Sequence, residues 1–187
     1  MQCRQQCQAG LEALRRGKDE SALDTFAAAC ESCPVDERAR FLYAESLWNG
    51  GNHEAAIAQM SEAQRLSGGD PESTIRLGQM HLAQGDVSRA AKEAARAISA
   101  APQSADAWAL EGDVLAQKQQ YDVALARYHR ALAYQANYPE VQFAVAELYA
   151  RQGKHGRALA TLSALSTQYA PDRIPQQLNI MRGRYCA

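Results

Sequence analysis

Small residues recur along this chain at a fixed interval of 34 residues, in a constant order with larger apolar residues. When Ala105 is taken as position 1 of a repeat, earlier repeats begin at residues 3, 37 and 71, and a later one begins at residue 139. Position 20 is alanine in every repeat: Ala22, Ala56, Ala90, Ala124 and Ala158. Positions 8 and 27 are Gly or Ala throughout, apart from Leu165. A period of this length is typical of proteins built from stacked helical units.

These columns predict two antiparallel helices joined by a tight turn in each repeat. Small residues at positions 8, 20 and 27 allow the helix axes to approach closely. Larger residues at position 24, with Ala94 as the exception, fill the space beside them. Position 15 is glycine in four repeats and Gln119 in the other. Glycine there ends the first helix because it readily adopts the left-handed conformation. The predicted helices cover residues 3–16, 19–32, 37–50, 53–66, 71–84, 87–100, 105–118, 121–134, 139–152 and 155–168.

The predicted repeats fill residues 3–172, with boundaries at 3–36, 37–70, 71–104, 105–138 and 139–172. Residues 173–187 begin a further helix at Pro175, which we interpret as a capping helix or as the first helix of a truncated sixth repeat. Because the end of a solenoid needs a polar outer face, the ending Tyr185-Cys186-Ala187 indicates that the natural protein continues beyond it.

The spacing and several residues resemble the tetratricopeptide repeat family. The residues that carry the resemblance are Trp108, Leu77-Gly78, Tyr149, Phe26 and Pro102, each in a matching column of the 34-residue pattern. Glu111 and Ala9 replace the usual leucine, and His81 stands where tyrosine is common. The resemblance implies an all-α, right-handed superhelical solenoid of antiparallel helix pairs, with five repeats and a terminal helix.

Composition and charge narrow the classes of partner. Apolar residues make up 47% of the 187 residues and the net charge is −1, so the chain can form a packed core and has no overall positive field for nucleic acid. No run of 18 apolar residues occurs, so direct insertion into a membrane is not expected. Arginine outnumbers lysine 16 to 4, and alanine and glutamine are abundant, which is typical of bacteria with GC-rich genomes. The compartment is left open.

The chain carries no motif that predicts catalysis or a cofactor. There is no glycine-rich phosphate loop after a strand and no His-Glu-x-x-His sequence. His53, His81, His129 and His155 fall on different faces of different repeats. We therefore expect a non-enzymatic protein.

Four cysteines are predicted to gather at one end of the first helix pair. Cys3 and Cys7 share a face of the first helix, and Cys30 and Cys33 end the second, which runs antiparallel to it. Three interpretations are open at this stage: reduced thiols that pack as small apolar residues, a pair of disulfides, or a tetrahedral zinc site.

The family resemblance also implies a concave groove lined by positions 2, 5, 9, 12 and 13 of the first helices. Two features of these positions suggest a partner-binding surface. One is an apolar cluster formed by Phe41, Trp48, Ile75 and Leu82, and the other is an acidic stripe formed by Glu45, Asp113 and Glu147. Gln79 and Phe143 complete the set of predicted groove residues. A peptide or protein partner with apolar and basic residues would suit such a groove. The alternative interpretation is packing between adjacent first helices for the aromatic residues, and a solvated face for the acids.

The leading hypothesis is thus a non-catalytic scaffold that binds a peptide or partner protein in its groove. A second hypothesis is a structural element that assembles into homodimers through its terminal helices. A third is a thiol- or metal-responsive module at Cys3, Cys7, Cys30 and Cys33.

Overall fold

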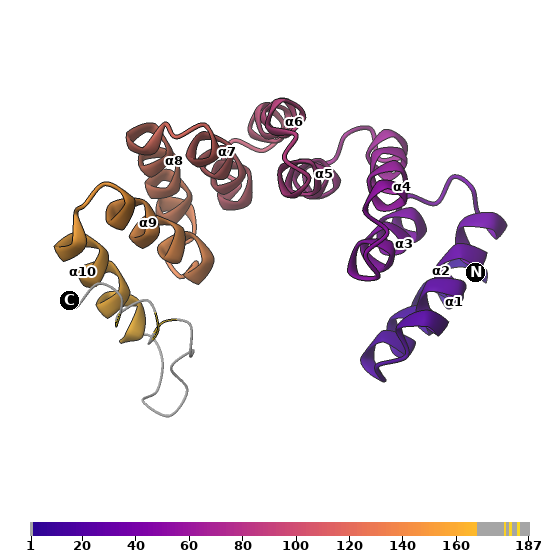
Figure 1. The fold of residues 1–187 in the computed structure, drawn as a ribbon. Helices are drawn as coiled ribbons and strands as arrows, with labels where there is room; N and C mark the ends of the chain where they lie inside the picture. The colour runs from indigo at the N-terminus through magenta and orange to yellow at the C-terminus, as the bar shows by residue number, and fades with distance from the viewer. Residues whose placement is uncertain (1, 168–177, 179, 181–182, 184–187) are drawn as a thin grey trace. The chain divides into compact units, whose positions relative to one another are not determined.

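The computed structural model describes residues 2–167, 178, 180 and 183, and all regular structure in this part of the chain is helical. The helices are α1 (Gln2–Arg15), α2 (Asp19–Ser32), α3 (Glu37–Asn49), α4 (His53–Leu66), α5 (Pro71–Ala83), α6 (Val87–Ala100), α7 (Ala105–Gln117), α8 (Tyr121–Tyr134), α9 (Pro139–Arg151) and α10 (His155–Ser166). Each begins and ends within two residues of its predicted bounds, so the ten predicted helices are confirmed (Figure 1). The terminal helix predicted over 173–187, including Pro175 and Cys186, lies outside the described residues except at positions 178, 180 and 183.

Consecutive helices form hairpins, and consecutive hairpins of the same unit pack against each other. The closest packing joins α1 to α2, α3 to α4, α5 to α6, α7 to α8 and α9 to α10. Between hairpins, α2 packs on α3, α4 on α5 and α8 on α9. The chain divides into two compact units, residues 1–100 with α1 to α6 and residues 101–187 with α7 to α10. The architecture is an all-α helical repeat solenoid, as predicted.

Four of the five hairpins have a large buried side chain at position 24 and a glycine or alanine at position 8, and the third has Ala94 at position 24 instead. Phe26, Met60 and Leu162 are fully buried, and Tyr128 is 2% exposed. A Cβ atom added to Gly112 would lie 2.5 Å from Cε1 of Tyr128, far inside van der Waals contact. Gly10 stands in the same relation to Phe26. The small residue at position 8 is therefore required by the ring that packs against it.

The turn inside each hairpin uses a left-handed residue. Gly17, Gly51, Gly85 and Gly153 have φ angles between 68° and 81°. In the fourth hairpin Gln119 takes the same conformation, with φ of 60°, and it is the only described residue other than glycine with positive φ. The backbone N–H of the next residue, Gln120, donates to the carbonyl of Leu115 at 2.9 Å and closes the helix end.

Three first helices begin with a side-chain cap. Asp36 accepts a hydrogen bond from the backbone N–H of Ala39 at 2.8 Å, and Asp70 accepts one from Ser73 at 3.1 Å. Ser104 accepts from the N–H of Ala107 at 3.2 Å. These caps fix where the first helices of the second, third and fourth hairpins start. None of the described helices is long and apolar enough to cross a membrane.

Candidate functional site

The apolar residues predicted to line a groove in the N-terminal unit are only partly available. Phe41, Trp48 and Leu82 are half-buried, whereas Ile75 is buried with 8% exposure. Phe41 and Trp48 both pack against a core cluster that the second hairpin forms together with Leu77 and Met80 of α5. Ile75 therefore leaves little of its side chain for a partner, and the exposed apolar surface rests on the other three residues.

The indole of Trp48 lies beside the turn of its own hairpin. Its ring stacks at an angle of 53° on the imidazole of His53, with ring centroids 4.3 Å apart. His53 is the first residue of α4, so this contact joins the end of α3 to the start of α4 across the turn. The contact orients the indole while leaving part of it exposed.

The charge of Glu45 is neutralised by Arg76, which is not among the predicted groove residues. The guanidinium of Arg76 on α5 binds both carboxylate oxygens of Glu45 on α3, with Nη2 3.0 Å from Oε2. Nη1 of Arg76 also donates to the side-chain oxygen of Gln79 at 3.3 Å. A two-pronged arginine–carboxylate pair of this kind has a fixed geometry. It links the first helices of the second and third hairpins and removes Glu45 from the predicted acidic stripe.

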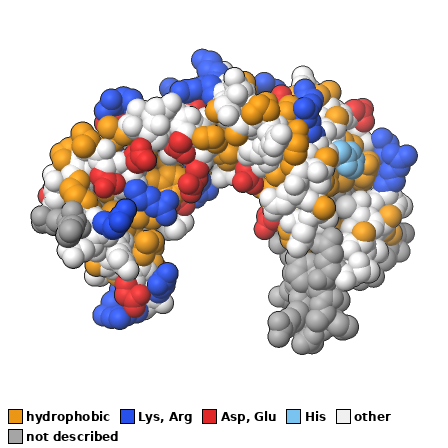
Figure 2. All heavy atoms as spheres, turned by 180° about the vertical axis from the view of Figure 1, so that it is seen from behind, with side chains coloured by type: hydrophobic (Ala, Val, Ile, Leu, Met, Phe, Trp, Pro, Cys, Tyr) orange, Lys and Arg blue, Asp and Glu red, His pale blue; other side chains and the backbone are white. Residues whose placement is uncertain are grey.

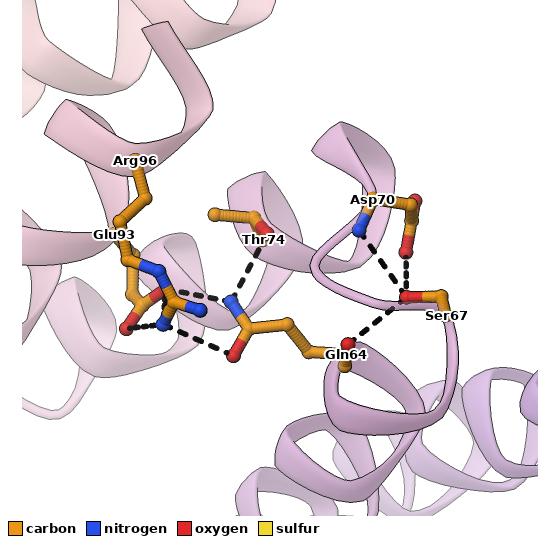
Figure 3. Close-up of polar contacts among 6 residues, drawn as sticks. All are labelled: Gln64, Ser67, Asp70, Thr74, Glu93 and Arg96. Atoms are coloured by element: carbon orange, nitrogen blue, oxygen red, sulfur yellow. Dashed lines mark hydrogen bonds and ion pairs between the residues drawn. The ribbon is translucent and has the colours of Figure 1, made fainter. Parts of the chain in front are cut away.

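A polar network fixes the junction between the second and third hairpins (Figure 3). Gln64 on α4 is 6% exposed, and its amide donates to Thr74 at 3.0 Å and to Glu93 at 2.7 Å. Arg96 pairs with Glu93 at 3.2 Å and donates to the amide oxygen of Gln64 at 3.4 Å. Because both ends of a buried amide are satisfied, this network positions α4, α5 and α6 relative to one another.

The loop between these hairpins adds a second polar cluster, also drawn in Figure 3. The hydroxyl of Ser67 donates to Asp70 at 2.6 Å, and the N–H of Ser73 donates to the same carboxylate. Burial raises the pKa of Asp70, but the hydrogen bonds from Ser67 and Ser73 outweigh it and hold this pKa below its usual value. Asp70 is therefore a structural cap that is charged at neutral pH.

Asp113 in the C-terminal unit is held by a tyrosine hydroxyl. Its half-buried carboxylate accepts a hydrogen bond from the hydroxyl of Tyr128 at 2.7 Å, and the structure gives it no ion pair within the described residues. Burial raises the pKa of Asp113, and the Tyr128 hydrogen bond only partly offsets this. Burial and the neighbouring Asp113 in turn raise the pKa of Tyr128.

A second aspartate on the same helix is arranged alike. Asp106 lies seven residues before Asp113 on α7, so the two occupy the same face. Asp106 accepts a hydrogen bond from the hydroxyl of Tyr138 at 2.7 Å, and burial followed by that hydrogen bond raises the pKa of Tyr138. Tyrosine hydroxyls thus orient both carboxylates without neutralising them.

The other two predicted groove residues of the C-terminal unit lie on α9. Glu147 is exposed and pairs with Arg151 one turn later, at 2.7 Å. Phe143 is half-buried and packs against Ala146 and Leu162. Of the three acids in the predicted stripe, Glu45 and Glu147 therefore have arginine partners, and Asp113 has none in the described part of the chain.

The four N-terminal cysteines lie together at one end of the first hairpin, as one disulfide and two thiols. Cys3 on α1 is joined to Cys33 at the end of α2, with their Cα atoms 6.3 Å apart. Cys7 and Cys30 are free and buried in the core of this hairpin. Burial raises the pKa of the Cys7 thiol, and it raises that of Cys30 to about 11. Both free thiols therefore stay protonated at neutral pH.

No three His, Cys, Asp or Glu side chains of the described chain are grouped so that they could hold a metal ion. His81 is 7% exposed in α5 and serves as a packing residue. Burial, followed by the charge of Arg89, holds the pKa of His81 below its usual value.

Sequence reasoning did not identify Arg76, Gln64 or the tyrosine partners of the aspartates. Their partners lie 10 to 32 residues away in the chain, on neighbouring helices. Arg130 is another such residue, because its guanidinium lies 4.0 Å from the ring centroid of Trp108. The contact between Asp113 and Tyr128 could have been suspected from the repeat pattern. Tyr128 stands at position 24, whose side chain faces the first helix of its own hairpin.

Three family models match the chain. Two models described as tetratricopeptide repeat cover residues 7–71 and 47–114, and one described as TPR repeat covers residues 112–153. No protein of curated function matches the sequence.

Solved structures with the same fold are similar over nearly their whole length. TTC0263, a thermophilic TPR protein of Thermus thermophilus, is 22% identical, with a TM-score of 0.78 over 98% of this chain and 97% of that one. MamA of Desulfovibrio magneticus is 18% identical, with a TM-score of 0.73 over 87% and 92%. YrrB, a TPR protein with an unusual peptide-binding site, is 15% identical, with a TM-score of 0.66 over 96% and 90%. Since the three family models together extend from residue 7 to residue 153, the chain belongs to the tetratricopeptide repeat family.

Proposed function

We propose that this protein is a non-catalytic scaffold that binds a peptide or a partner protein through the first helices of its hairpins. Membership in the tetratricopeptide repeat family supports a role in protein–protein interaction. The observation that carries the proposal further is the pair of aspartates on α7, each held by a tyrosine hydroxyl and neither paired with a cation within the described residues.

The aspartates favour a partner with basic residues. A carboxylate that is partly desolvated gains more from a cation than one that is fully hydrated, because the effective dielectric constant is lower there. Asp113 is such a carboxylate, and the Tyr128 hydroxyl holds it in one orientation. A lysine or arginine placed against it would replace water with a charge-assisted hydrogen bond.

The N-terminal unit offers apolar contacts instead. Phe41, Trp48 and Leu82 are half-buried. The charge of Glu45 on the same set of first helices is already neutralised by Arg76. Aromatic residues that are oriented by packing but still partly exposed are frequent anchors of binding energy. On the face shown in Figure 2, acidic side chains of this unit lie beside hydrophobic and basic ones, so no single charge dominates it. Apolar side chains of a partner are therefore expected here.

A selection from a random peptide library displayed on phage tests the charge preference. Peptides selected by the whole protein should be enriched in Lys or Arg beside apolar residues. The double variant Asp106→Asn, Asp113→Asn should bind them roughly tenfold more weakly, since each exposed or half-buried pair contributes up to about 1 kcal/mol. Asp122→Asn removes an acid from the second helix α8 and serves as the control, with unchanged binding expected. Selected peptides without basic enrichment would contradict the proposal.

Fluorescence tests the apolar half of the proposal. The chain has two tryptophans, so Trp108→Phe leaves Trp48 as the sole indole. A selected peptide should shift the emission of Trp48 in this variant, and Trp48→Ala should weaken binding while the helical circular dichroism stays unchanged. If the emission of Trp48 does not change at saturating peptide, the surface around Trp48 is not the binding site.

Assembly of two copies through residues 173–187 remains a prediction from the sequence, because this segment lies almost entirely outside the described residues. Size-exclusion chromatography of the chain with and without these residues would test it.

A further inference from the structure

A disulfide closes the first hairpin of the N-terminal unit at the end opposite its turn, beside two thiols. Cys3 of α1 is bonded to Cys33, the residue that caps α2, across a sequence separation of 30 residues. Both cysteines of the disulfide are half-buried, whereas Cys7 and Cys30 are buried. A reagent in solution therefore reaches the disulfide more easily than the two thiols.

Helix α1 buries few side chains in the hairpin that it completes. Among residues 3–15, only Cys7 and Gly10 are buried, and glycine has no side chain to bury. Leu11 and Leu14 are half-buried against the core cluster of this hairpin. Helix α3, by comparison, buries five residues: Ala39, Leu42, Ala44, Ser46 and Leu47. Because the free energy gained by burial grows with the apolar area removed from water, packing by itself holds α1 weakly.

The disulfide compensates for this weak packing. It joins the first turn of α1 to the end of α2, so the two helices stay tied together even when their packing loosens. A cross-link of this kind stabilises a fold mainly by limiting the conformations of the opened chain, and the effect grows with the length of the closed loop. The attachment of α1 therefore depends on the oxidation state of one bond.

The surface that α1 covers is apolar, and both thiols lie in it. Phe26 and Ala29 of α2 are fully buried, and the ring of Phe26 lies against Gly10 of α1. Cys7 and Cys30 belong to the same core cluster. A thiol reacts as its thiolate, so burial keeps both groups inert while α1 is in place. Detachment of α1 would bring both thiols into water and make them reactive.

We infer that the Cys3–Cys33 disulfide is a redox-sensitive latch on α1. A dithiol reductant opens it in two exchange steps: one thiolate attacks a disulfide sulfur to form a mixed disulfide, and the second thiol of the reductant then displaces the protein. The reductant gives up two electrons and leaves as a disulfide, and Cys3 and Cys33 end as thiols. Helix α1 then detaches, the face of α2 around Phe26 is uncovered, and helices α3 to α6 stay folded.

Counting the reactive thiols tests the latch on the whole chain. Cys186→Ser removes the fifth cysteine, so that two thiols and one disulfide remain. The protein is treated with dithiothreitol, freed of it by anaerobic gel filtration and exposed to N-ethylmaleimide, and mass spectrometry locates the labels. All four cysteines should be labelled, Cys7 and Cys30 on the order of a hundredfold faster than in the oxidised protein, because the constraint on the opened chain is gone. Rapid labelling of Cys3 and Cys33 alone would overturn the proposal.

The double variant Cys3→Ala, Cys33→Ala reproduces the open latch without a reductant. In the same Cys186→Ser background, its Cys7 and Cys30 should react as fast as they do in the reduced protein. Dithiothreitol should change these rates no further, because the bond that it acts on is absent. Thiols as slow as those of the oxidised protein, or a continued response to dithiothreitol, would contradict the latch.

Hydrogen exchange gives a second readout that does not depend on thiol chemistry. On reduction, the backbone amides of α1 should lose protection, while those of α3 and α5 keep theirs. Unchanged protection in α1 would show that the disulfide is a local brace, and equal loss from α1 to α6 would show that the whole unit unfolds. Either result would overturn the latch. The groove proposal would still stand, since none of the groove residues named above lies in α1 or α2.

Discussion

At the scale of single residues, the chain departs from the repeat pattern at two positions, Gln119 and His81, and each departure should affect the free energy of unfolding. Gln119 holds the left-handed conformation that glycine holds in the other hairpins. His81 fills a buried place where the family commonly has tyrosine, and burial keeps its imidazole uncharged. Both departures were visible in the sequence. Whether each raises or lowers the stability of the fold depends on the backbone angle of Gln119 and the burial of His81, which only the structure shows.

Gln119→Gly is expected to stabilise the protein by about 0.5–1 kcal/mol. The substitution relieves the left-handed strain of a residue with a Cβ, which outweighs the extra freedom that glycine gains in the unfolded chain. Urea unfolding measures the change. The neighbouring Lys118→Gly is the control: Lys118 has a φ of −74°, so glycine there only adds freedom to the unfolded chain and should destabilise. Stabilisation by both variants, or by neither, would contradict this explanation.

His81 should make stability depend on pH below about 6.5. Because its pKa is lowered in the folded state, the unfolded chain binds the proton more readily once the pH falls below the usual histidine value of 6.5. The stabilisation is therefore present above pH 6.5 and is lost as the pH falls through the folded-state pKa. Unfolding free energies of the wild type should decrease between pH 6.5 and 5 more steeply than those of His81→Gln. Equal slopes would show that His81 is protonated without cost.

At the scale of secondary-structure elements, the first and fourth hairpins each depend on one aromatic ring that fits against a glycine. Tyr128 on α8 lies over Gly112 on α7, and its hydroxyl reaches Asp113 on the same helix. The same ring thus packs the hairpin and orients a carboxylate of the proposed binding surface. Packing and recognition are coupled in this hairpin because one residue serves both.

Gly112→Ala is expected to destabilise the protein by about 1–3 kcal/mol, since the added methyl group would overlap the ring of Tyr128. Thermal unfolding measures the loss. Gly156 on α10 provides the control, because nothing lies within 4 Å of a Cβ added there. Gly156→Ala should therefore be neutral or stabilising, through the higher helix propensity of alanine. A Gly112→Ala variant as stable as the wild type would mean that the hairpin can open without cost.

At the scale of the whole molecule, the chain consists of two compact units, and within each unit the main contacts between described hairpins join consecutive ones. Stability in such a solenoid is approximately a sum of local terms and nearest-neighbour interfaces. Each unit contains one tryptophan, Trp48 in the first and Trp108 in the second. The two indoles can therefore report separately on the two units.

Gly112→Ala should lower the unfolding midpoint seen by Trp108 more than the midpoint seen by Trp48. Single-tryptophan variants, Trp48→Phe and Trp108→Phe, allow each indole to be followed alone during urea unfolding. The reverse order is expected for Gly10→Ala, which crowds Phe26 in the first unit. Identical shifts at both indoles would show that the chain unfolds as one cooperative body.

The sequence by itself determined the helices, their pairing into hairpins and the family. It could do so because small and large residues recur at a fixed interval, and each column reports a local packing requirement that is the same in every hairpin. Only the tertiary structure showed that Arg76 neutralises Glu45, that Ile75 is buried, and that tyrosines hold Asp106 and Asp113. These contacts join side chains from different helices, so their partners follow from how the helices are placed in space and not from the spacing along the chain.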